Sequence, residues 1–211
     1  MKILEKTMQA VKDFDTSIVA ARNEFEQNKK VLFETYSNTV AAEKIGAASA
    51  ALTTFEANAT KSARDIITAD FAEVRNAVFE FVSKSVPEDF PATLSAIQAK
   101  GEKITDFEAE SFLKKYEDNY TAYSAILTVL HSHGKAADVY VLVPDKVNDA
   151  IDDMANRVLN WVQNRTSSSF NSEYYTRLFT QETGSPIHAL ADRIENFISG
   201  EFILDNSHKA V

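Results

Sequence analysis

The side chains best suited to chemistry in this 211-residue chain are acidic and lie close together between residues 145 and 156. Asp145, Asp149 and Asp152 are separated by four and three residues, so on a helix these carboxylates would share one face. Carboxylate oxygens are preferred ligands of Mg²⁺, and a protein-bound Mg²⁺ commonly holds a substrate phosphate as well. One hypothesis is therefore a Mg²⁺-dependent enzyme that acts on a phosphorylated small molecule through Asp149, Asp152 and Asp153.

The stretch from Asp152 to Asn156 superficially resembles the aspartate-rich motif of isoprenoid synthases, whose carboxylates hold Mg²⁺ that in turn binds diphosphate. This chain departs from that motif, because Asn156 replaces the last Asp and no second acidic motif accompanies it. Acidic side chains near the start of a helix also stabilise the helix dipole without any metal. We therefore keep the magnesium site as an alternative and expect no metal or other cofactor.

Other sequence patterns of catalysis are missing. The chain has no cysteine, which excludes thiolate nucleophiles, thiolate metal sites and disulfides. Its five glycines are isolated and cannot build a phosphate-cradling loop, and no Gly-x-Ser-x-Gly sequence is present. We expect a protein without enzymatic activity.

A heptad-like apolar seam dominates the N-terminal part of the chain. Its members, Leu4, Val11, Ile18, Phe25 and Leu32, follow one another at intervals of seven residues. Such a repeat places one side chain on the same helix face every two turns, and a narrow stripe of this kind suits pairing with another helix. The sequence therefore predicts a coiled-coil-like helix whose seam binds a second helix.

A second seam, from Ile45 to Phe81, is about one residue out of phase with the first. A single helix over residues 1–86 would be about 130 Å long, far beyond the radius of a compact domain of this size. We expect a helical hairpin that bends between Ala42 and Thr53, near Gly46, with Thr53 starting a capping box. One continuous helix remains the alternative, because the alanine-rich stretch there favours helix.

The remaining residues, 87–211, predict an acidic helical domain that either stands apart from the hairpin or packs with it as one domain. Pro87 and Pro91 end the hairpin, and Thr105 opens a helix that reaches roughly His131. Residues 139–143 predict either a short strand paired with residues 201–204 or an apolar connector packed into the core. Further helices are expected over 144–165, from about 171 to 179 and from 186 to Gly200. The predicted fold class is mainly α, with a long N-terminal hairpin, a C-terminal bundle and one small two-stranded element.

The charge distribution limits the partners. The net charge is −9, and residues 1–86 carry 11 basic against 12 acidic side chains, so residues 87–211 contribute −8. An acidic surface repels nucleic acid and anionic membranes, and the longest uncharged run is too short and polar to cross a bilayer. We expect a cytoplasmic protein that binds neither nucleic acid nor membrane.

Together these features favour a non-enzymatic interaction or assembly protein. It would form a homo-oligomer, or bind a helical protein partner, through the seam of residues 4–32. The competing interpretation is that the seam only closes the hairpin within one chain. Composition alone also suggests a structural or assembly component of a phage or mobile element, which would make the protein virion-associated.

Overall fold

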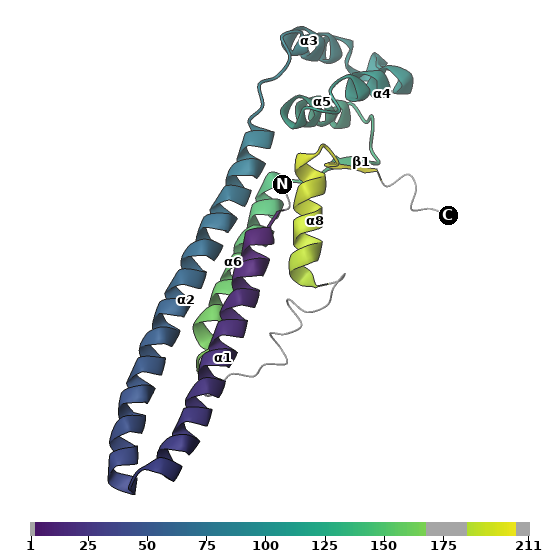
Figure 1. Ribbon diagram of the computed structural model, residues 1–211. Helices are drawn as coiled ribbons and strands as arrows, with labels where there is room; N and C mark the ends of the chain where they lie inside the picture. Colours follow the sequence, from purple (N-terminus) through teal and green to yellow (C-terminus); the bar gives the residue numbers. More distant parts are fainter. Residues whose placement is uncertain (1–2, 168–184, 206–211) are drawn as a thin grey trace. The chain divides into compact units, whose positions relative to one another are not determined.

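The computed structural model describes residues 3–167 and 185–205, and these residues form a mainly α-helical fold (Figure 1). Seven α-helices, one 3₁₀ helix and one two-stranded antiparallel sheet occur in these ranges. The predicted fold class is thus confirmed, including the long N-terminal hairpin and the small β element. The predicted helix at residues 171–179 lies outside the described residues.

The hairpin consists of α1, Glu5–Thr35, and α2, Asn38–Val82. The prediction that it bends between Ala42 and Thr53 was wrong, because the chain turns at Tyr36 and Ser37 instead. Tyr36 adopts an extended conformation that ends α1. Gly46 lies inside α2, where it continues the alanine-rich helix that the propensities favour.

The phase shift between the two seams now has a physical explanation. The first seam stops at Leu32 because α1 ends three residues later, and the second seam belongs to a separate helix. The predicted capping box at Thr53 is also wrong. Thr53 and Thr54 donate their hydroxyl hydrogens to the carbonyls of Ser49 and Ala50, one turn earlier in the interior of α2.

The predicted helix from Thr105 to His131 is interrupted. Thr105 does form the predicted capping box with Glu108, and it opens α4, Asp106–Lys115. Asn119 then caps a new helix, α5, Tyr120–Ser132, by accepting a hydrogen bond from Ala122 N–H. The other helices are α3, Phe90–Lys100; η1, Gly101–Lys103; α6, Pro144–Asn164; and α8, Pro186–Ile198.

The small sheet pairs β1, Val139–Val141, with β2, Ile203–Asp205. The strands are antiparallel, and Tyr140 lies opposite Leu204. The predicted partner strand was therefore placed within about two residues of its position. A strand this short is stabilised by neighbouring structure rather than by its own hydrogen bonds.

The chain divides into two compact units, and α2, α6 and α8 each contribute residues to both. One unit comprises Lys2–Glu73 and Asp152–Ala189; the other comprises Val74–Ile151 and Leu190–Val211, with Met1. The predicted domains, 1–86 and 87–211, stay a prediction.

In the unit that contains α1, three helices lie side by side (Figure 1): α1, residues 38–73 of α2 and residues 152–164 of α6. The ring of Phe14 on α1 packs edge-on against Trp161 on α6, with 5.9 Å between the ring centroids. The other unit has an aromatic core in which Phe81, Tyr120, Phe197 and Phe202 surround one another. Each unit therefore has its own buried aromatic contacts.

Candidate functional site

The first three residues of the predicted seam are buried within the chain. Leu4, Val11 and Ile18 are each less than 5% exposed. Phe25 and Leu32, further along α1, are only half-buried. The N-terminal part of the seam therefore packs inside one molecule, whereas its last two residues retain accessible surface.

A buried carboxylate fixes the start of α1 against α2. Leu4 precedes α1 and has no side chain that can cap it, so the amide of Thr7 needs another acceptor. Asp70 on α2 supplies one, because its Oδ2 accepts from Thr7 N–H at 2.8 Å and from Thr7 Oγ1 at 2.7 Å. Lys6 and Glu73 form an ion pair at 2.5 Å one turn away, and that hydrogen bond raises the pKa of Lys6.

A group of polar contacts, which we call the polar belt, joins the hairpin to the end of α6. The guanidinium of Arg22 donates from Nε to Glu56 Oε1 at 2.6 Å and from Nη2 to the carbonyl oxygen of Thr166 at 2.7 Å. Arg22 thereby links α1, α2 and the residues that follow α6. Two further contacts belong to the belt, Arg165 Nε to Asp15 Oδ1 at 2.5 Å and Arg64 Nη1 to Gln163 Oε1 at 2.7 Å.

Residues 23–55, which we call the arm, follow the polar belt on α1 and precede it on α2. In the fully described stretch between Ile18 and Thr60, Ala41 is the only buried residue. Apart from Ala41, the facing side chains of these two helices are at best half-buried, and an isolated pair of helices has little core to stabilise it. Large apolar side chains of the arm face solvent: Val31, Phe33, Tyr36, Val40 and Phe55.

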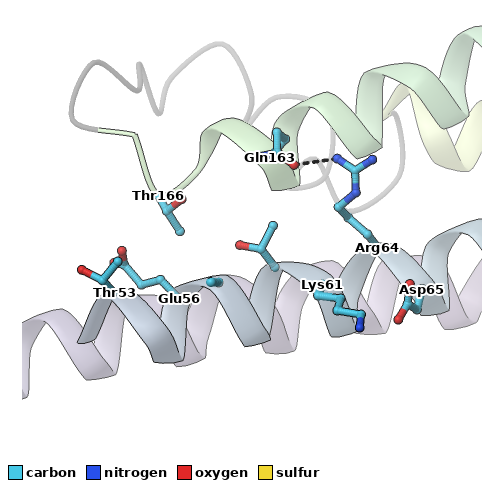
Figure 2. A pocket seen from close by; sticks show the side chains of 9 residues that line it. Thr53, Glu56, Lys61, Arg64, Asp65, Gln163 and Thr166 are labelled. Atoms are coloured by element: carbon cyan, nitrogen blue, oxygen red, sulfur yellow. Dashed lines mark hydrogen bonds between the residues drawn. The ribbon is translucent and has the colours of Figure 1, made fainter. Parts of the chain in front are cut away.

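A surface pocket of about 440 Å³ lies beside the polar belt, between α2 and the end of α6 (Figure 2). Two of its charged groups are already paired, Glu56 with Arg22 and Arg64 with Gln163. Figure 2 shows Arg64 reaching toward Gln163 on α6, whereas the side chains of Lys61 and Asp65 do not extend toward α6. The pocket is lined by Thr53, Glu56, Ala57, Thr60, Lys61, Arg64, Asp65, Gln163 and Thr166, a set without a nucleophile next to a base.

The aspartates of the alternative magnesium hypothesis are exposed on α6. Asp149 lies 4.0 Å from Lys146, and Asp153 accepts an ion pair from Arg157 at 2.8 Å. Among residues 3–167 and 185–205, no three His, Cys, Asp or Glu side chains are grouped so that they could hold a metal ion. The described geometry therefore adds no support to a metal site at Asp149, Asp152 and Asp153.

One serine–histidine contact was not foreseen from the sequence. Ser185 Oγ lies 2.6 Å from His188 Nδ1, a separation at which a base could activate a nucleophile. Ser185 is fully buried, however, and it directly precedes α8, where its carbonyl oxygen accepts the amide hydrogen of Ala189. The pair therefore lies at the start of α8, where serine is a preferred residue immediately before a helix.

The helices of the described residues include none that is long and apolar enough to span a bilayer. No protein-family model matches the chain, and neither a curated protein nor a solved structure matches it.

Proposed function

We propose that this chain is a non-enzymatic helical interaction protein that self-associates through the arm. The observation that carries the proposal is the incomplete packing of residues 23–55, described above. Two helices that leave their facing side chains half-buried and several large apolar residues exposed gain stability when another helix covers them. The predicted seam residues Phe25 and Leu32 belong to this arm.

A substitution that tests the proposal must weaken association without unfolding the monomer. Ile18→Asp is unsuitable, because Ile18 is fully buried and a charge there would unfold the chain. Phe33→Glu on α1 and Ala50→Glu on α2 are suitable, because both residues are exposed and glutamate favours helix. Phe107→Glu on α4 is the matched control, because Phe107 is 78% exposed and lies outside the arm.

Light scattering coupled to size-exclusion chromatography gives the mass of each variant. We expect the unmodified chain to exceed its monomer mass of 23.5 kDa, and at least one of the two arm variants to return to it. Phe107→Glu should keep the mass of the unmodified chain, and far-UV circular dichroism should show unchanged helicity in all three variants. A monomeric unmodified chain, or arm variants that keep its oligomer mass, would contradict the proposal.

Composition supports placing this assembly in the cytoplasm, or in a virion if the protein belongs to a phage. The protein would then be a coiled-coil-like, oligomeric assembly protein. Localisation of a tagged chain in its native host would test the cellular part of the proposal.

A further inference from the structure

We infer that the partner on the arm is a second copy of this chain, packed antiparallel along the outer face of α2 with Glu43 of each copy paired to Lys61 of the other. This inference rests on the proposed self-association and specifies its geometry. It follows from which face of α2 is free, which charges that face carries and how they are spaced.

The outer face of α2 is defined by helical spacing. The residues of α2 that face α1 in the arm are half-buried and include Ile45, Ala48 and Leu52. A second row of residues lies on the opposite side of α2, half a turn from the residues that face α1. Its members follow one another at intervals of four, three, four, three and four residues, so they share one side of the helix. All six are exposed: Glu43, Ala47, Ala50, Thr54, Ala57 and Lys61.

This face carries little charge. From Ile45 to Thr60 the only charged residue is Glu56, and Glu56 is already engaged by Arg22 in the polar belt. Sixteen helical residues span about 24 Å, so more than four turns of exposed helix present no unpaired charge. Covering such a surface with another helix requires little desolvation of ionic groups. An exposed helix that has to remain alone in water normally carries charges on its outer face.

The small side chains in the middle of the row also suit a second helix. Helices separate by 8–10 Å according to the size of the residues between them, and alanine permits the short end of that range. At short separation the backbones and the flanking side chains of the two helices make many contacts. A large or charged residue at Ala50 would prevent this approach.

The two charged residues that bracket the row determine the direction of the partner. The row is symmetric about the level of Leu52, so in an antiparallel pair Ala47 lies opposite Ala57 and Ala50 opposite Thr54 of the other copy. In the same alignment each Glu43 meets a Lys61, which makes two intermolecular ion pairs. A parallel pair would bring Glu43 against Glu43 and Lys61 against Lys61.

Both charged residues are available for such pairing. Among the ion pairs of the described residues, none includes Glu43 or Lys61. Lys61 and Ala57 line the surface pocket between α2 and the end of α6, and both residues are exposed. An antiparallel pair of identical helices is also compatible with a two-fold axis, the commonest symmetry of homo-oligomers.

Charge reversal tests the pairing. Glu43→Lys and Lys61→Glu each replace two attractive contacts per dimer with two repulsive ones, and we expect each to raise the dissociation constant about tenfold. The double variant Glu43→Lys with Lys61→Glu restores opposite charges and should return to within about threefold of the unmodified chain. Glu34→Lys, an equal charge change on α1, is the matched control and should have no such effect.

Cysteine cross-linking tests the direction, because the natural chain contains no cysteine. Ala47→Cys and Ala57→Cys chains, labelled with different isotopes and mixed, should form mixed disulfide dimers in preference to dimers of either chain alone. Preferential Ala47→Cys homodimers would show a parallel pair and overturn the inference.

The two proposals fail in different ways. A monomeric unmodified chain would remove both. An oligomer that Phe33→Glu dissociates and Ala50→Glu leaves intact would preserve self-association through the arm and overturn the outer face of α2 as its site. An oligomer that is insensitive to both single charge reversals would likewise overturn the Glu43–Lys61 pairing.

Discussion

Replacing Asp70 with alanine is the most direct perturbation of the α1–α2 hairpin. Asp70 is 3% exposed, and its Oδ2 accepts both the amide and the hydroxyl hydrogens of Thr7. The hydrogen bonds join residues that are 63 positions apart in the sequence. Asp70→Ala removes both bonds and leaves two buried donors at the start of α1 without their acceptor.

The size of the effect follows from these contacts. A hydrogen bond to a charged group contributes about 1.5–3 kcal/mol, so two of them predict a loss of at least about 3 kcal/mol in the free energy of unfolding. Thr7→Val keeps the shape of the side chain and the amide bond to Asp70, and should lose about 1.5 kcal/mol. The double variant should lose less than the sum, because both changes remove the same hydroxyl contact.

Urea unfolding followed by circular dichroism measures these losses as shifts of the midpoint at unchanged slope. Glu73→Ala is the control, because it breaks a neighbouring ion pair whose side chains are about half exposed and should cost less than about 1 kcal/mol. If Asp70→Ala costs no more than Glu73→Ala, the carboxylate does not hold the start of α1 and the reasoning is refuted.

Three further predictions concern other parts of the chain. Gly46→Ala should raise the free energy of unfolding by about 0.5–1 kcal/mol in thermal or urea denaturation. Gly46 lies inside a helix, and an added Cβ would meet no atom within 4 Å. A lower free energy of unfolding would contradict this prediction. Phe202→Ala should cost about 3–5 kcal/mol in the same assay, because the ring is fully buried among other aromatic rings, and a loss below 1 kcal/mol would show a loosely packed site. The hydrogen bond from Lys115 lowers the pKa of the Asp89 carboxyl below its ordinary value of 3.8, so this pair stabilises the fold above that pH and loses its effect as the pH falls through the lowered value. An NMR titration of the Asp89 carboxyl should show the lowered midpoint, and Lys115→Met should raise that midpoint toward the ordinary value. A midpoint that Lys115→Met leaves unchanged would disprove the assignment.

The hairpin could be predicted from sequence because its two helices are indicated by residues that are close together in the chain. A seven-residue apolar repeat and an uninterrupted run without proline identify long amphipathic helices, and the length argument requires them to fold back. The position of the bend does not follow from Gly46, because a single glycine does not end a helix whose neighbouring residues favour it. Gly46 is surrounded by alanines that favour helix, whereas Ser37 and Asn38 lie at the true turn and carry side chains that suit helix starts.

The side-chain contacts that fix the arrangement of the helices could not be predicted from the sequence. The sequence around Asp70 does not distinguish it from an acidic residue at the surface, because its burial depends on the packing of α1 against α2. Arg22 reaches Thr166 across 144 positions of the chain, and no local pattern indicates such a pairing. Four of the five predicted seam residues lie in α1, whereas Leu4 precedes it, and only the structure distinguishes the buried Ile18 from the half-buried Leu32.

Self-association through the arm is most directly tested by sedimentation equilibrium of the unmodified chain over a wide range of concentrations. The proposal predicts that the average mass rises with concentration from 23.5 kDa toward about twice that value. At least one of the Phe33→Glu and Ala50→Glu chains should then remain at the monomer mass throughout the same range. An unmodified chain that stays at 23.5 kDa at every concentration would contradict the proposal.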